Sequence, residues 1–218
     1  HSHYDHALDV PHLAQSLSHA KIVGSKSTLN IARGGDIPET QLIQVRPFHS
    51  MTFGQFEVIA IPSKHTPPTA VNDGLGEEIK KPLILPARFS AFKEGGSFDY
   101  LINYQGYKIL VKASTGAVAE QFKNLKIDAL FLGIAQLSKQ SAEFQTRYLH
   151  ETLGTLKPTV VIPIHWDNFF SPAHQPLEFL PRIADNAPQS MHALVKEAKK
   201  QNSHVVLLTT PKAYAIFN

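Results

Sequence analysis

The sequence predicts a mixed α/β fold in which helices pack on the faces of a sheet. Short apolar runs repeatedly end in Pro or Gly, which is typical of strands and turns and not of a helical bundle. In the second half of the chain, buried-strand patterns alternate with patterns of helical spacing. The first half is richer in strand patterns, and no stretch has the composition of a linker. We therefore expect residues 1–218 to form a single domain.

The first half begins with a helix whose first turn contains Pro11, a position that suits proline. Helical segments are expected at 10–17 and 27–32, and strands at 21–25, 41–47 and 56–63. Residues 66–96 contain four prolines and four glycines, so we expect a long surface loop, either a binding lid or a simple connection. Residues 97–114 predict a hairpin that turns at Gln105-Gly106.

The second half predicts helices packed against further strands of the sheet. Helices are expected at 117–125, 143–156, 176–186 and 190–202, and strands at 127–135, 159–166 and 204–210. The densest basic run, Lys196 with Lys199 and Lys200, is expected on the solvated face of the last helix.

Composition excludes several classes of protein. The chain has no cysteine, which excludes disulfides, thiolate zinc sites and a Cys nucleophile. No apolar run reaches the roughly 18 residues that a membrane span needs. No basic stripe is interleaved with aromatic residues, so we expect no nucleic-acid partner. The compartment, whether cytoplasmic or periplasmic, and the oligomeric state are left open.

The first six residues, HSHYDH, contain three histidines and an aspartate. In an extended segment His1 and His3 point the same way and can share one metal ion, while Asp5 and His6 can face the same cavity at a second. Imidazole and carboxylate are ligands that zinc and similar divalent ions prefer. The alternative is a purification-tag remnant or a frayed polar terminus, but a pure histidine tag would not contain Asp5 or Tyr4.

Two later histidines have the context of metal ligands. His65 and His165 each follow an apolar strand at its carboxyl end, where a rigid sheet can hold a ligand in place. The remaining histidines lack this context, and we expect them at the surface or in ordinary helices and loops: His12, His19, His49, His150, His174, His192 and His204.

HSHYDH resembles the HxHxDH signature of the metallo-β-lactamase superfamily, and IPSKHT, ILVKASTG and VVIPIHWDNF follow in the order found there. The resemblance implies a four-layer αββα sandwich with a metal site at one edge. It also implies that His1, His3 and His65 hold a first metal ion and that Asp5, His6 and His165 hold a second. In that fold the signature follows several N-terminal strands, so we expect the native protein to be longer at its N-terminus.

One position departs from the superfamily pattern. Ser114 stands where an aspartate usually bridges the two metals, and the chain is similar to a subgroup with a GSAG-like turn and a PIHWDDF-like motif. A neutral hydroxyl is a poorer ligand than a carboxylate, so we expect one or two divalent ions, with the second bound more weakly. Zn²⁺ is expected, with Mn²⁺ or Fe as alternatives. Ser114 would contact a metal-bound water or cap the next helix.

The resemblance implies a metal-dependent hydrolase in which metal-activated water attacks an ester, a lactone or a phosphodiester of small-molecule size. Asp5 would orient the nucleophile, shuttle a proton or serve only as a ligand, and Ser63 and Asp167 are candidates to orient the imidazoles. One alternative is a non-catalytic metal-binding or ligand-binding protein with a degraded dinuclear site. The others are a nuclease, which the missing basic stripe opposes, and a redox di-iron enzyme, whose branch carries glutamate in place of His3.

Overall fold

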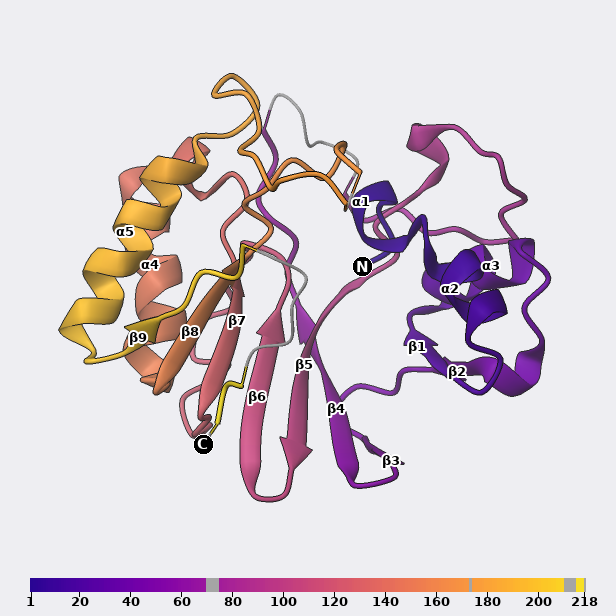
Figure 1. Cartoon of the computed structure of the whole chain (residues 1–218), viewed down its shortest axis with the longest axis horizontal. Helices are drawn as coiled ribbons and strands as arrows, with labels where there is room; N and C mark the ends of the chain where they lie inside the picture. Colours follow the sequence, from indigo (N-terminus) through magenta and orange to yellow (C-terminus); the bar gives the residue numbers. More distant parts are fainter. Residues whose placement is uncertain (70–74, 173, 210–214, 218) are drawn as a thin grey trace.

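The computed structural model describes residues 1–69, 75–172, 174–209 and 215–217. Its centre is a seven-stranded mixed sheet (Figure 1). In spatial order the strands are β3 (Ser50–Phe53), β4 (Phe56–Ser63), β5 (Ser97–Tyr104), β6 (Tyr107–Lys112), β7 (Ala129–Gly133), β8 (Val160–Ile164) and β9 (His204–Val205). Neighbours from β3 to β6 are antiparallel, and those from β6 to β9 are parallel.

The hairpin between β5 and β6 confirms the turn expected from the sequence. Gln105 and Gly106 both have positive φ, at 49° and 89°, which is the backbone that a two-residue hairpin turn requires. The strand twist and the turn twist then agree, and the strands pair from Tyr104 with Tyr107 up to Tyr100 with Val111.

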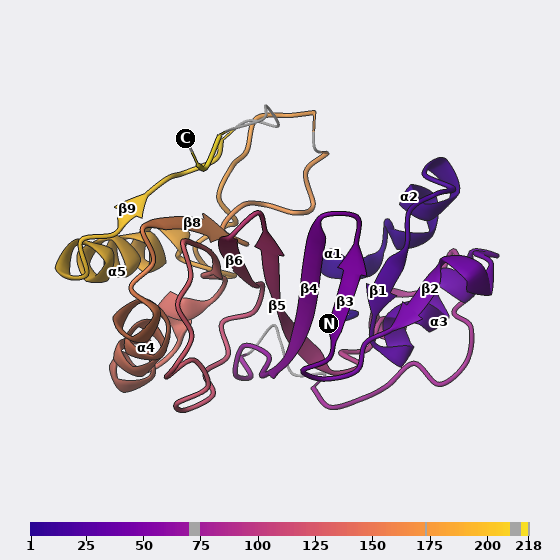
Figure 2. The same cartoon turned by 90° about the horizontal axis from the view of Figure 1, so that it is seen from below.

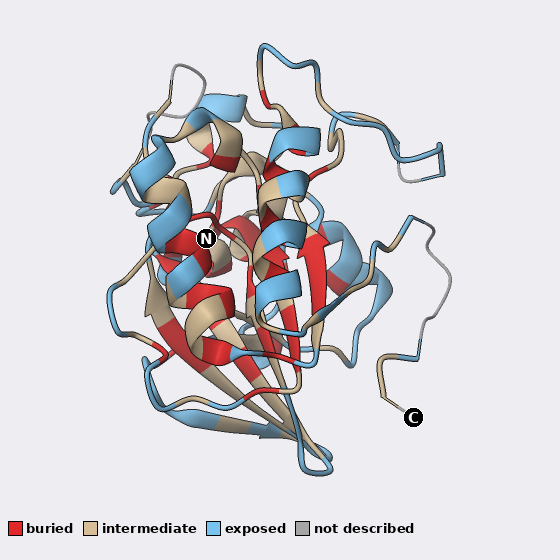
Figure 3. Cartoon of the chain, turned by 90° about the vertical axis from the view of Figure 1, so that its left-hand side faces the viewer, coloured by how far each residue is buried: buried red, intermediate tan, exposed pale blue. Residues whose placement is uncertain are grey.

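Helices cover one face of the large sheet. The helix α4 (Ala142–Leu149) continues as a π-helical turn (His150–Gly154) and packs with α5 (Ala187–Lys200) on this face. The sheet contributes a row of apolar side chains in register: Ile59, Leu101, Leu110, Leu130 and Val161. The outer sides of the helices are exposed, while the strands behind them are buried (Figure 3).

The opposite face carries the adjacent row in the same register: Val58, Ile102, Ile109, Ala129 and Val160. All of these except Ala129 are half-buried, and α4 and α5 both lie on the other side of the sheet (Figure 2). Because side chains alternate along each strand, the large sheet has two apolar faces. One forms a core closed by the helices, and the other is more open.

A second, smaller unit lies beside β3 and β4 (Figure 1). It contains α1 (Tyr4–Ala7), α2 (Val10–Ser16), α3 (Lys26–Gly34) and a parallel pair of strands, β1 (Ile22–Gly24) with β2 (Leu42–Gln44). Ser25 caps α3 by accepting a hydrogen bond from the Thr28 amide. Two apolar clusters belong to this unit, one around Ile31 and Phe92 and one around Ala32 and Ile37. Among the described residues, the β1–β2 pair forms the second sheet.

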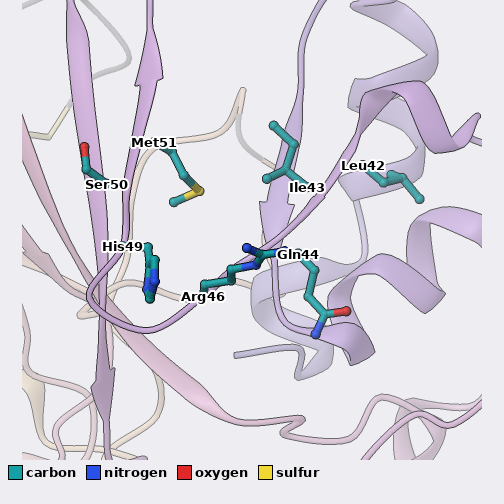
Figure 4. A pocket seen from close by; sticks show the side chains of 7 residues that line it. All are labelled: Leu42, Ile43, Gln44, Arg46, His49, Ser50 and Met51. Atoms are coloured by element: carbon teal, nitrogen blue, oxygen red, sulfur yellow. The ribbon is translucent and has the colours of Figure 1, made fainter.

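Short 3₁₀ turns complete the described structure: Glu39–Gln41, Phe89–Ala91 and Leu137–Lys139. A hollow of about 630 Å³ lies between β2 and β3, with Leu42, Ile43 and Gln44 on one side and His49, Ser50 and Met51 on the other (Figure 4). Arg46 also lines this hollow, and none of the residues expected to bind metal does. Within the described residues, no helix is long and apolar enough to cross a membrane.

Two expected elements are wrong, and a third is shorter than expected. Residues 117–125 form successive turns instead of a helix, because Glu120 has a left-handed φ of 56° that a helix cannot contain. Residues 176–186 are irregular, and Pro181 explains this because proline removes a helical donor and clashes with the preceding turn. The last strand covers only His204–Val205 of the expected 204–210, and residue 210 lies outside the described residues.

Candidate metal centre

The structure brings together the six residues that the sequence singles out as metal ligands. His1 and His3 lead directly into α1, which contains Asp5 and His6. His65 lies two residues beyond the end of β4, and His165 follows β8 immediately. Segments far apart in the sequence therefore meet at the carboxyl-end edge of the large sheet, where the N-terminus lies next to α1 (Figure 1).

The first group consists of His1, His3 and His65. One ring nitrogen from each lies within 4.8 Å of the other two, and His3 Nδ1 lies 3.2 Å from His65 Nε2. The Nδ1 atom of His65 lies 2.9 Å from the carbonyl oxygen of Thr66. Because a carbonyl only accepts, Nδ1 carries the proton and Nε2 keeps the lone pair that a metal ion needs.

His1 supplies the sharpest test of whether a metal ion fits this group. Its Nε2 atom is buried and has no hydrogen-bond partner among the described residues. Buried polar atoms in proteins are nearly always paired, so a lone nitrogen of this kind needs a partner. A cation held between His1, His3 and His65 would supply it, and three imidazoles are a normal donor set for zinc.

The second group consists of Asp5, His6 and His165. His165 Nε2 lies 3.1 Å from Asp5 Oδ2 and 3.1 Å from His6 Nε2, and His6 Nε2 lies 3.4 Å from Asp5 Oδ2. Ligand atoms about 2.1 Å from a tetrahedral metal ion lie about 3.4 Å from one another. The three ligand atoms are therefore spaced as the ligands of a single metal ion would be.

The two groups adjoin. The ring centroids of His1 and His6 are 3.9 Å apart, and those of His1 and His65 are 4.5 Å apart. One ligand atom each of His1, Asp5 and His6 also lies within 4.8 Å of the others. The arrangement can thus hold a single ion or two neighbouring ions.

Burial and charge set these groups in the protonation states that bind metal. Burial by itself raises the pKa of Asp5, but the His165 hydrogen bond and the nearby charges of His6 and His165 outweigh it and hold that pKa well below its usual range. Burial lowers the pKa of His6 to about 3, against the opposing effect of the Asp5 carboxylate. Burial also lowers the pKa of His65. At neutral pH these are a carboxylate and neutral imidazoles, the forms that coordinate cations.

The backbone at His165 is strained. Its φ of 57° lies in the left-handed region, which residues other than glycine rarely adopt and which is enriched at functional sites. The conformation turns the chain sharply at the end of β8, between buried Pro163 and buried Trp166, and places the imidazole against Asp5.

Ser114 contacts the centre through His1. Its Oγ atom lies 3.2 Å from Nδ1 of His1, the nitrogen on the opposite side of the ring from the unpartnered Nε2. No helix follows at residues 117–125, so the expected alternative role as a helix cap does not apply.

Sequence reasoning missed two residues that position the site. Ser2 is fully buried, and its hydroxyl donates to the carbonyls of Lys93 and Glu94 at 2.8 and 3.0 Å. Thr66 orients His65 through its carbonyl. The alternation of Ser2 with His1 and His3 was a signal for its role, because its side chain had to point away from the site. Thr66 gave no such signal.

The other candidates lie elsewhere. Ser63 accepts a hydrogen bond from Lys112 at 3.0 Å, and Asp167 forms a backbone bridge with Phe179. The remaining histidines are exposed, as expected: His12, His19, His49, His150, His174, His192 and His204. Lys196, Lys199 and Lys200 are also exposed, on α5.

No protein-family model and no curated protein sequence matches the chain. Among solved structures it is similar to YhfI of Bacillus subtilis, a metallo-β-lactamase fold protein, with 15% identity and a TM-score of 0.55 over 96% of this chain and 72% of that chain. It is also similar to unliganded yeast PDE1, with 12% identity and a TM-score of 0.55 over 96% of this chain and 65% of that chain.

A third similar structure is CmlA, a diiron β-hydroxylase from Streptomyces venezuelae, with 13% identity and a TM-score of 0.50 over 81% of this chain and 34% of that chain. The chain thus spans less than two thirds of the length of the PDE1 and CmlA chains. The mixed sheet, the helices on its face and the likeness to YhfI agree with the resemblance of the HSHYDH motif. The chain has the metallo-β-lactamase fold.

Proposed function

We propose that the chain is a metal-dependent hydrolase that binds one or two divalent ions, with zinc the expected metal. The observation that carries this proposal is the convergence of two adjoining sets of ligand atoms: the imidazoles of His1, His3 and His65, and the Asp5, His6 and His165 side chains. An ion bound there would polarise a substrate oxygen and lower the pKa of water toward about 7.

Asp5 is the residue to which we assign a catalytic role. Its pKa is held well below the usual range by the His165 hydrogen bond and nearby charges, which overcome the effect of burial. It therefore stays ionised at neutral pH and acts as a hydrogen-bond acceptor, which suits a group that orients an attacking water. It is not suited to donate a proton as a general acid at that pH.

Exposed aromatic side chains that pack on residues next to the ligands favour a substrate with an apolar part. Phe89 is 64% exposed, and its ring lies 5.5 Å from that of Tyr4, between His3 and Asp5 in the sequence. Phe170 is 66% exposed and packs on Phe169, whose ring lies 5.6 Å from that of His165. We propose an ester, lactone or phosphodiester that carries an apolar group as the substrate class.

The test begins with metal binding by the full chain. Protein stripped with a chelator is titrated with Zn²⁺, Mn²⁺ and Fe²⁺ by calorimetry, and bound metal is measured by elemental analysis. Loaded protein is then assayed on aryl esters, lactones and bis(4-nitrophenyl) phosphate. The Asp5→Asn variant tests the catalytic assignment, and His12→Ala, at an exposed histidine, is the matched control.

Three results are informative. Turnover that depends on metal and is lost in Asp5→Asn supports the proposal. Tight metal binding without turnover on the panel supports the alternative of a non-catalytic binding protein. Absence of bound metal at micromolar concentrations of each ion overturns the proposal.

A further inference from the structure

We infer that Ser114 is a positioning residue for His1 and not a metal ligand, and that the turn Ser114–Gly116 holds His1 and His65 in one rigid frame. The inference rests on the proposed metal site. It concerns the role of the Ser114 hydroxyl, at the position where a carboxylate was expected, in directing two imidazoles toward one ion.

The first step is the contact between Ser114 and His1. Ser114 is 5% exposed, and its Oγ atom lies 3.2 Å from His1 Nδ1. When Nδ1 carries the proton of the neutral imidazole and donates to this hydroxyl, Nε2 keeps its lone pair. That Nε2 is the buried atom with no partner among the described residues. A hydrogen bond of this kind fixes both the tautomer and the direction of a ligating imidazole.

The second step is the way the turn is anchored. The Thr115 amide donates to the Thr66 hydroxyl at 3.1 Å, and the Thr115 hydroxyl donates to the Ala135 carbonyl at 2.8 Å. Gly116 packs so closely against residues 64–65 that an added Cβ would overlap the Lys64 carbonyl and lie 2.7 Å from the His65 carbonyl oxygen. The turn is therefore fastened to the segment that carries His65.

The third step joins the two imidazoles. The Thr66 hydroxyl accepts a hydrogen bond from the Thr115 amide, and the Thr66 carbonyl accepts one from the His65 Nδ1–H. His65 is thus directed by Thr66, and His1 is directed by Ser114, one residue away from the Thr115 contact. A shift of this turn would move both ligating nitrogens together.

The geometry also explains why a hydroxyl suffices at position 114. Ser114 Oγ contacts Nδ1 of His1, whereas Nε2, the other ring nitrogen, is the buried atom without a partner among the described residues. An oxygen on the outer side of the ring stabilises a ligand without meeting the ion. The charge that a bridging aspartate would supply is then absent, so the second ion should bind more weakly than the first.

The test compares Ser114→Ala and Ser114→Thr with the wild type in chelator-stripped full chain. We expect Ser114→Ala to weaken binding of one Zn²⁺ equivalent by roughly 10- to 100-fold, and Ser114→Thr, which keeps the hydroxyl, to restore affinity to within about threefold. The absorption spectrum of saturating Co²⁺ should be unchanged in Ser114→Ala, because the ligand set is intact.

Ser190→Ala is the matched control. Ser190 is fully buried and accepts a hydrogen bond from the Ser138 amide at 3.0 Å, between α5 and the 3₁₀ turn Leu137–Lys139. It should lower the urea midpoint of the metal-free protein without changing Zn²⁺ affinity. Urea titration of metal-free Ser114→Ala separates loss of metal affinity from loss of fold.

Several outcomes would overturn the inference. Wild-type affinity in Ser114→Ala removes the positioning role, and a Co²⁺ spectrum that changes with loss of an oxygen ligand makes Ser114 a direct ligand. If the wild-type chain binds no metal, the proposed function fails together with this inference. If the wild-type chain binds metal and Ser114→Ala binds it equally well, only this inference fails.

Discussion

Lys112 and Asp99 form an ion pair inside the large sheet. Lys112 Nζ lies 3.2 Å from Asp99 Oδ2 and 3.0 Å from Ser63 Oγ, and both charged side chains are only 1% exposed. The pair joins β4, β5 and β6 on the helix-covered face. Removing one partner of such a pair leaves the other charge buried without compensation, which typically costs about 3–5 kcal/mol.

The cost of Lys112→Met can be worked out from what happens to Asp99. The attraction lost at 3.2 Å is about 5 kcal/mol at an effective dielectric constant of 20. Burial raises the pKa of Asp99, against the opposing charge of Lys112, so without the lysine this carboxyl takes up a proton on folding. Protonating a carboxyl of unfolded pKa about 3.9 at pH 7 costs about 4 kcal/mol. The stability lost in Lys112→Met is therefore limited to about this value, because Asp99 takes up a proton when keeping its charge would cost more.

This limit gives the prediction a pH dependence of known sign. The folded variant binds one more proton than its unfolded chain above pH 3.9, so its stability relative to wild type recovers as the pH falls. The same calculation at pH 5 gives a loss of only about 1.5 kcal/mol. Changes in other groups are common to both proteins and cancel in the difference.

Urea denaturation at pH 7 and pH 5 measures both values. Lys112→Met combined with Asp99→Asn should be more stable than Lys112→Met alone at pH 7, because no charge is then buried. Lys123→Met is the matched control, since the Lys123–Glu120 pair is 66% and 74% exposed and should contribute at most about 0.5 kcal/mol. A loss below about 1 kcal/mol at pH 7, or one that does not shrink at pH 5, would refute the reasoning.

Three further predictions concern the site and its support. His165→Ala should remove one equivalent of bound metal by elemental analysis while exposed His192→Ala retains it, and equal metal content in the two variants would contradict the assignment. Burial lowers the pKa of His6 to about 3, so only the unfolded chain takes up its proton between pH 6.5 and 3, and metal-free protein should lose about 2 kcal/mol from pH 7 to pH 5. Urea titration should show this loss reduced in His6→Asn, and an unchanged slope would count against it. Gly116→Ala should lower the thermal midpoint by several degrees, because its Cβ would overlap the Lys64 carbonyl, and an unchanged midpoint would show that the turn can shift freely.

The parts of the fold that could be predicted from the sequence are those dictated by local chemistry. The β5–β6 hairpin needs two residues of positive φ, and Gln105-Gly106 is a pair that accepts it. The buried strands β7 and β8 are unbroken apolar runs, and α5 has its polar residues at helical spacing.

The parts that could not be predicted depend on tertiary contacts. Residues 117–125 have a helical pattern, but the chain instead places Phe122, which is 3% exposed, in the main core through a left-handed residue at Glu120. Tertiary packing of this kind overrides a weak helix propensity.

The candidate centre also has a part that could be predicted from the sequence and a part that could not. HSHYDH with His65 and His165 could be recognised because residue type and strand position were enough. The contact of Ser114 with His1 spans 113 residues, and nothing in the local sequence specifies which side of the imidazole the hydroxyl meets. Spacing thus predicted which residues gather but not which of their atoms face one another.

The centre lies between two separate apolar cores, so the ligands come from both of them. Asp5 and His6 belong to α1, whose Ala7 packs in the cluster with Ile31 and Phe92. His65 and His165 are carried by β4 and β8 of the large sheet, whose core is distinct from that cluster. An ion that bound ligands from both sides would join the two cores directly. Its binding energy would then add to the stability of their contact, since a ligand that binds only the folded state stabilises it by about 4 kcal/mol at a thousandfold excess over Kd.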